Sequence, residues 1–262
     1  MEKIYQKYLA HKVFEQLNSY SNFYKDLSFH ITGFITPGIQ SIINIDTYVY
    51  SSIQGTLESI RDILLKGRIN DSYSLLRKYY DSTIINIYSI LYLSDNFGID
   101  NFVVKQIDNW RKGTQKLPEY SVMSNYIRAS EKLAPINNLL HQNDTYRKIK
   151  KRCNDHTHYN YYHYLILNDN EIFLQNRLDW LNTFLKDLED IFIQHISYIL
   201  YLNDHYMMSS DYVDSLDMGI IPDDDSKYFV ASFIQEMFDS IFKVKRMDIA
   251  LEIKKRTAMK LD

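Results

Sequence analysis

Cysteine, proline and glycine are scarce in this chain: its 262 residues include 1 Cys, 4 Pro and 7 Gly. Sheet proteins need many tight turns, and proline and glycine are the residues that such turns use most. Their scarcity therefore favours long helices joined by few breaks. Because the single Cys153 cannot form a disulfide within the chain, the sequence fits a reducing compartment, and we expect a cytoplasmic location.

Long hydrophobic runs are missing as well. The best apolar stretches, residues 83–93 and 192–202, are too short to cross a bilayer. The first residues, MEKIYQKYLAHK, lack the apolar core of a signal peptide, so we expect no membrane association. A net charge of −3 argues against a protein that coats nucleic acid by bulk electrostatics, but it leaves room for a local basic patch.

Several enzyme motifs do not occur in the sequence. It contains no Gly-rich phosphate loop, no nucleophile elbow and no dinucleotide-binding fingerprint. Kinase, hydrolase and dehydrogenase activities are therefore not expected, and no residue pattern calls for a cofactor.

Apolar residues recur at helical spacing in every long segment, and no alternating strand pattern competes with them. The expected helices cover residues 2–17, 40–66, 70–95, 100–111, 119–132, a basic segment from Thr145, 169–203, 228–243 and 247–259. Gly67 is placed to end the second helix, and Asn70 or Asp71 to cap the third, which predicts a helical hairpin. We expect an all-α fold: an antiparallel helical bundle over residues 1–203, then an acidic loop and a C-terminal helical appendage over residues 204–262.

The richest local pattern is residues 147–164, RKIKKRCNDHTHYNYYHY. Positive charge binds phosphate, tyrosine rings stack on bases, and imidazole transfers protons near neutral pH. The candidates for RNA binding are Arg147, Lys148, Lys150, Lys151, Tyr159 and Tyr161. The alternative is that the basic run is an ordinary solvated helix face.

Arg152, Asn154 and His158 are the catalytic candidates. An arginine followed after four to six residues by a histidine, with a polar residue close behind the arginine, resembles the signature of the HEPN superfamily. Residues 73–77, YSLLR, with Asp81 also resemble a helix of uncharacterised HEPN-like bacterial proteins. The resemblance covers roughly residues 40–203.

HEPN domains are small, all-α and often homodimeric, and many are metal-independent RNases of toxin–antitoxin, abortive-infection and CRISPR systems. The resemblance implies an endoribonuclease or RNA-binding toxin or phage-defence protein, with an RNA substrate and an antitoxin or defence partner. In that chemistry His158 moves protons and Arg152 stabilises the phosphate, with no metal. One histidine per chain leaves a proton role unfilled, which two subunits sharing a cleft would supply.

Alternatives stay open at this point. Cys153 directly follows Arg152, where active relatives of this type carry the polar residue, and this departure favours a catalytically inactive HEPN-like module that binds a partner protein or a nucleotide-bearing ligand. On one continuous helix, Arg152 and His158 point roughly 120° apart, so they converge only if the helix breaks near Asn154 or if two subunits meet.

The histidines and tyrosines of this segment raise two further possibilities, a metal site and a dimer. His156, His158 and His163 form a weaker metal candidate, because no further ligand motif accompanies them. The 23 tyrosines exceed what one core of this size normally needs. We therefore expect a homodimer in which residues 152–164 lie at or beside the interface.

Overall fold

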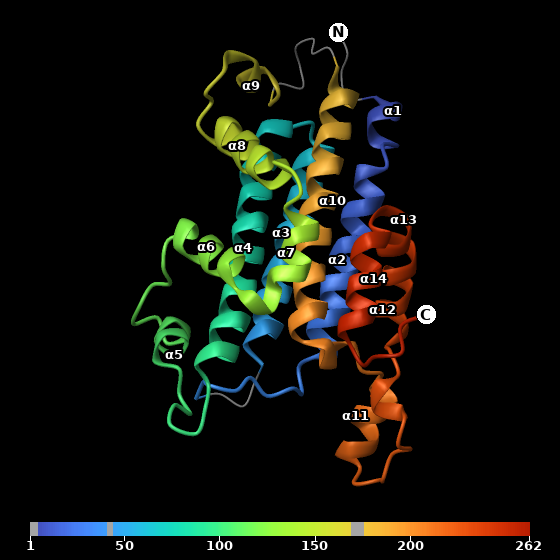
Figure 1. Ribbon diagram of the computed structural model, residues 1–262. Coiled ribbons are helices and arrows are strands. Elements are labelled where there is room, and N and C mark those ends of the chain that lie inside the picture. Colours follow the sequence, from blue (N-terminus) through green and yellow to red (C-terminus); the bar gives the residue numbers. More distant parts are fainter. Residues whose placement is uncertain (1–4, 41–43, 169–175) are drawn as a thin grey trace. The chain divides into compact units, whose positions relative to one another are not determined.

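The computed structural model describes residues 5–40, 44–168 and 176–262, and over these residues the expected all-α fold is confirmed. The described residues form isolated β-bridges but no β-strand. The α-helices are α1 Gln6–Leu9, α2 Val13–His30, α3 Ile45–Leu65, α4 Ile69–Asn96, α5 Lys105–Arg111, α6 Tyr120–Ala129, α7 Ala134–Leu140, α8 Thr145–Thr157, α9 Tyr162–Ile166, α10 Arg177–Leu202, α11 Ser210–Asp217, α12 Ser232–Met237, α13 Lys243–Lys245 and α14 Met247–Arg256 (Figure 1). A π-helical turn, Phe238–Phe242, joins α12 to α13.

The link between α3 and α4 is the hairpin turn that the sequence predicts. Gly67 has φ +76°, and its N–H donates to the Leu64 carbonyl at 2.8 Å. A positive φ favours glycine, because a Cβ in that region meets the backbone. The start of α4 differs from the prediction. The helix already begins at Ile69, so Asn70 and Asp71 lie in its first turn and do not precede it.

Other boundaries also differ, for identifiable local reasons. The expected first helix is split, because His11 Nδ1 accepts from the Val13 N–H at 3.2 Å and so begins α2. The expected acidic loop of residues 204–225 contains helix α11. Residues 229–231 are not helical, because the Ser209 N–H donates to Phe229 O at 2.7 Å and the Ala231 N–H to Met207 O at 2.9 Å. The start of the expected 169–203 helix lies outside the described residues.

Close contacts group the chain into two units. The first contains Met1–Lys25, Tyr48–Thr83 and Asn143–Phe192, and the second contains Asp26–Thr47, Ile84–Gln142 and Ile193–Asp262. Four long helices, α2, α3, α4 and α10, contribute residues to both, so the units are not consecutive lengths of chain. The expected boundary after residue 203 is a different kind of division and stays a prediction.

Tyrosine fills much of the core. In the first unit, Tyr20 stacks on Phe192 with ring centroids 3.7 Å apart, and the Tyr24 and Tyr79 hydroxyls lie 3.0 Å apart. Of the 23 tyrosines, 13 are buried: Tyr8, Tyr20, Tyr24, Tyr50, Tyr73, Tyr79, Tyr80, Tyr88, Tyr146, Tyr164, Tyr198, Tyr201 and Tyr206. Core packing therefore accounts for most of the tyrosine surplus. The homodimer stays a prediction, and of the tyrosines only the exposed ones can support it.

The second unit buries a polar network around Asp46, in the first turn of α3. Asp46 accepts from Asn86 Nδ2 at 2.8 Å and from the Tyr206 hydroxyl at 2.9 Å. Asn86 Oδ1 in turn accepts from His195 Nε2 at 2.9 Å. Burial raises the pKa of the Asp46 carboxyl to about 6 and lowers the pKa of His195 to about 3. The histidine is therefore neutral near pH 7, and the carboxylate is held by neutral donors.

Asp46 gives the protein an unusual pH dependence. Because its pKa rises from 3.8 unfolded to about 6 folded, folding favours the protonated carboxyl. Its stabilising contribution is present below about pH 4 and is lost as the pH rises through 6, a change of up to about 3 kcal/mol in the free energy of unfolding. Asp46→Asn removes this dependence, because an amide side chain does not titrate between pH 4 and 7.

Urea unfolding of wild type and Asp46→Asn, followed by circular dichroism between pH 4 and 7, measures this contribution. We expect the variant to gain stability relative to wild type as the pH rises. A difference that is constant across this range would contradict the assignment.

Within the described residues, no helix combines the length and the apolar composition that a membrane crossing requires.

Candidate nucleic-acid interface

Helix α8 begins at Thr145, as the sequence predicts, and lies beside the first half of α4 (Figure 1). Four of its five buried residues are spaced three or four apart, Tyr146, Ile149, Cys153 and His156, and the fifth is Asp155. That spacing buries one helix face and leaves the opposite face to the basic residues. Arg147, Lys148 and Lys151 are exposed, whereas Lys150 is half-buried.

Arg152 ties α8 to α10. Its Nε donates to Asp187 Oδ2 at 2.7 Å, and its Nη2 donates to Asp187 Oδ1 at 3.2 Å. The Asp187 side chain is only 4% exposed, and it also accepts from the Tyr73 hydroxyl at 3.5 Å. A buried carboxylate without a cation is strongly destabilising, so Arg152 is committed to neutralising Asp187.

Asn154 ties α8 to α4. Its side-chain oxygen accepts from Arg77 Nη1 at 2.8 Å, and Arg77 Nε donates to Asp81 Oδ2 at the same distance. Asp81 therefore orients Arg77, and Arg77 in turn holds α8 against α4. Asn154 lies inside α8 and does not cap a new helix, so the break that would bring Arg152 towards His158 is absent.

Cys153 lies on the buried face between these two residues and is fully shielded from solvent. Burial raises the pKa of its thiol to about 12, so it stays protonated near neutral pH. This position faces the core, so a small thiol fits there.

His156 is a core residue. Its Nδ1 donates to the Asn70 side-chain oxygen at 2.8 Å, and its ring lies between Tyr73 and Tyr164, with centroids 3.9 and 4.0 Å away. Burial lowers its pKa to about 3, with smaller contributions from the charges of Arg152 and His163. The imidazole is therefore neutral near pH 7.

The end of α8 is a tight turn with a non-glycine residue at positive φ. Tyr159 has φ +49°, and the Asn160 N–H donates to the Asp155 carbonyl at 3.0 Å. The Asp155 carboxylate accepts from Asn160 Nδ2 and from Lys151 Nζ, both at 2.8 Å. These hydrogen bonds to Lys151 and Asn160 lower the pKa of Asp155. Asp155 therefore fixes both the turn at the end of α8 and the side chain of Lys151.

Beyond the turn, three tyrosine rings face solvent. Tyr159, Tyr161 and Tyr162 are 43%, 50% and 78% exposed, and His158 and His163 are exposed beside them. At about 100° per residue, Arg147, Lys151 and His158 fall within roughly 40° of one another on α8. We call Arg147, Lys148, Lys151, His158, Tyr159, Tyr161 and Tyr162 the basic–aromatic surface.

The predicted catalytic set does not converge within one chain. Arg152 lies in α8 and His158 directly follows its last residue, so with no break between them the two side chains project about 120° apart, and Arg152 is bound to Asp187. The cations on the His158 side of α8 are instead Arg147 and Lys151. A site shared between two subunits stays a prediction. No group of three His, Cys, Asp or Glu residues in the described part of the chain is arranged to hold a metal ion.

Sequence reasoning missed two residues of this region. Asp187 interrupts an apolar helix face between Leu185 and Leu188, and an acid at a core position signals a buried cation partner. Tyr162 is the most exposed of the tyrosines in residues 159–164, and it belongs to the same tyrosine run as the candidates Tyr159 and Tyr161.

The free energy of unfolding should distinguish Arg152, which braces α8, from the exposed Arg147 and His158. Arg152→Ala leaves Asp187 buried without its cation and should lower the free energy of unfolding by about 2–3 kcal/mol, since Arg152 is itself partly exposed. His158→Ala and Arg147→Ala should each change it by less than about 0.5 kcal/mol. Urea unfolding near pH 7 measures all three, and an Arg152→Ala variant as stable as wild type would refute the bracing role.

The chain matches no protein-family model, no curated protein and no solved structure.

Proposed function

We propose that this chain is a HEPN-like RNA-binding protein that holds single-stranded RNA on the basic–aromatic surface. One observation carries the proposal. The exposed stripe of α8 that contains Arg147 and Lys151 leads directly into the exposed rings of Tyr159, Tyr161 and Tyr162. Phosphates would lie along α8, and bases would stack on the tyrosines.

Single-stranded RNA fits this surface better than a duplex. Aromatic side chains stack on bases that are already splayed out, and such stacking tolerates any sequence. The electrostatic part is local, because the chain as a whole carries −3. Lys148 is exposed, whereas Arg147 is paired with Asp144 and Lys151 with Asp155, so a bound phosphate must share these two cations with the acids.

Tyrosine and lysine replacements should weaken RNA binding in different ways. Tyr162→Ala should weaken binding by about 5- to 150-fold at every salt concentration, since one stacking contact contributes about 1–3 kcal/mol. Lys148→Gln with Lys151→Gln should weaken binding and reduce the slope of log K against log salt by about 1.4, or about 0.7 for each lost phosphate contact. Fluorescence anisotropy with a labelled single-stranded RNA of mixed sequence measures both.

Matched controls carry the same chemical change elsewhere. Tyr48→Ala removes a tyrosine that is also highly exposed, and Lys254→Gln with Lys255→Gln removes two exposed lysines of α14. Neither control should alter RNA binding beyond twofold. Wild-type protein that does not bind single-stranded RNA at low salt would overturn the proposal and favour a HEPN-like module that binds a protein partner.

RNA cleavage is the second candidate function, and the position of His158 favours it. Its imidazole is exposed at the end of the stripe that carries Arg147 and Lys151, where a bound phosphate would lie. His158 would transfer protons to or from the ribose oxygens, while a neighbouring cation stabilises the crowded phosphate. In a homodimer the second proton carrier is the partner's His158. An RNase of this kind would act as a toxin or phage-defence protein, with an antitoxin or other defence protein as its partner.

Cleavage should depend on His158 and not on a neighbouring imidazole. His158→Ala should abolish cleavage of mixed RNA, whereas His163→Ala, which also removes an exposed imidazole, should retain it. The reaction should persist in EDTA, because His158 supplies the proton transfer without a metal. Gel analysis of labelled RNA with these proteins side by side decides the question. Equal rates for wild type and His158→Ala would exclude this mechanism but would leave RNA binding in place.

A further inference from the structure

The second unit contains a cleft that the proposed function does not use. It has a volume of about 610 Å³ and lies between Ile85 of α4, Trp110 of α5, Met123 of α6 and the α5–α6 loop. This volume falls within the range of sites that hold small molecules. The cleft belongs entirely to one unit and contains none of the residues of the basic–aromatic surface.

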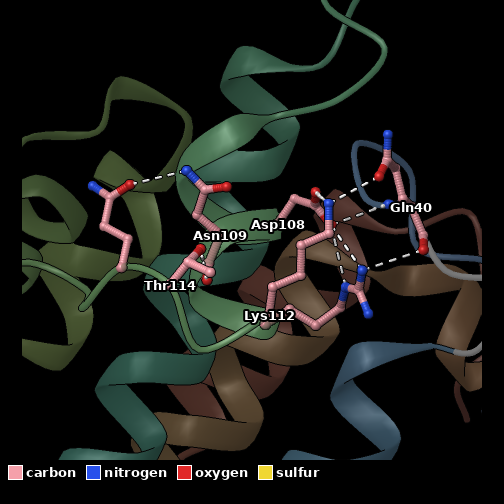
Figure 2. A network of polar contacts seen from close by, with 7 residues as sticks. Gln40, Asp108, Asn109, Lys112 and Thr114 are labelled. Atoms are coloured by element: carbon pink, nitrogen blue, oxygen red, sulfur yellow. Dashed lines mark hydrogen bonds and ion pairs between the residues drawn. The ribbon is translucent and has the colours of Figure 1, made fainter.

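The loop that forms one wall is held in place by Asn109. The Asn109 carbonyl accepts from the N–H groups of Thr114 at 2.9 Å and Gln115 at 3.3 Å, and from Thr114 Oγ1 at 3.1 Å. Its side-chain nitrogen donates to Gln115 Oε1 at 3.3 Å, as Figure 2 shows. Gly113 makes the turn with φ +74°. The wall is therefore already formed, which lowers the entropy lost when a ligand binds.

The cations next to the cleft differ in their availability. Asp108 is buried and binds both Arg111, at 2.9 Å, and Lys112, and it accepts from the Gln40 N–H at 3.4 Å (Figure 2). Those two charges are therefore already neutralised in part. Lys116 is the charged side chain among the described lining residues, and no described acid lies within ion-pair distance of it. Its ammonium group is free to meet an anion.

The apolar part of the cleft includes the indole of Trp110. Trp110 is half-buried, and its ring stacks on no other ring of the described residues. Ile85, Leu117, Pro118 and Met123 complete the apolar wall. A half-buried indole beside a free ammonium group suits a ligand that combines a flat ring with a negative charge.

We infer that this cleft binds a small molecule in which a flat aromatic ring is joined to one anionic group. The ring packs against Trp110, and the anion pairs with Lys116. The thiol, imidazole and tyrosine groups of residues 152–164 play no part, so the site is independent of RNA binding.

A titration with adenosine monophosphate tests the inference. The chain has two tryptophans, so in a Trp180→Phe background the tryptophan emission, excited at a wavelength that tyrosine does not absorb, reports on Trp110 alone. We expect saturable quenching. Adenosine, which lacks the anion, and inorganic phosphate, which lacks the ring, should each bind at least about tenfold more weakly, because each makes only one of the two contacts.

Two replacements separate the contacts, with calorimetry as a second readout. Lys116→Met should weaken binding of adenosine monophosphate about tenfold and remove its salt dependence, whereas Lys105→Met, at an exposed lysine of the same segment, should leave it unchanged. Trp110→Leu should weaken binding by more than about tenfold. All variants should keep the circular dichroism spectrum of wild type.

Three outcomes would overturn the inference: no saturable quenching, equal affinity in Lys116→Met, or loss of the adenosine monophosphate signal in the Lys148→Gln, Lys151→Gln protein. The last result would place the nucleotide on the basic–aromatic surface. RNA binding should be unaffected by Lys116→Met, so failure of the cleft and failure of the RNA proposal are distinguishable.

Discussion

The Arg152–Asp187 pair sets the rotation of α8, and the surface of the first unit depends on that rotation. Asp187 is buried on α10, where a lone carboxylate would be strongly destabilising. It therefore requires a cation, and Arg152 is the residue that reaches it. Asn154, which also lies on α8, accepts a hydrogen bond from Arg77 of α4 and so fixes α8 at a second point. With these residues turned inward, Arg147, Lys151 and His158 are turned outward.

His156 and His158 are two residues apart, yet the first is a buried packing residue and the second is exposed to solvent. A step of two residues turns the side chain by about 200°, from the core to solvent. His156 is stacked between two tyrosines, and its pKa is lowered to about 3 because burial disfavours the charged form. His158 is exposed at the helix end. Only the exposed imidazole can exchange protons with a bound molecule.

The two units present different kinds of surface. In the first, exposed cations and tyrosine rings follow one helix and the turn after it, which suits an extended polymer with repeating phosphates and bases. In the second, one indole and one free ammonium group share a cleft of about 610 Å³, which suits a small ligand. Both arrangements combine aromatic side chains with positive charge. The first is an open surface that suits a long ligand, and the second is a cleft that suits a small one.

The sequence by itself determined the helical class, the hairpin turn at Gly67, the start of α8 and the location of the basic and aromatic residues. These features are local, because helix periodicity, glycine at positive φ and charge clustering act over a few residues. Only the tertiary structure decided that Arg152 and Asn154 brace α8, that His156 is buried and that most tyrosines belong to the core. Their partners, Asp187, Arg77 and Asn70, are far away in sequence. Within residues 147–164 the spacing can indicate only the local pair of Lys151 with Asp155, whereas the pairing of Arg152 depends on Asp187 of α10, which packs against the helix.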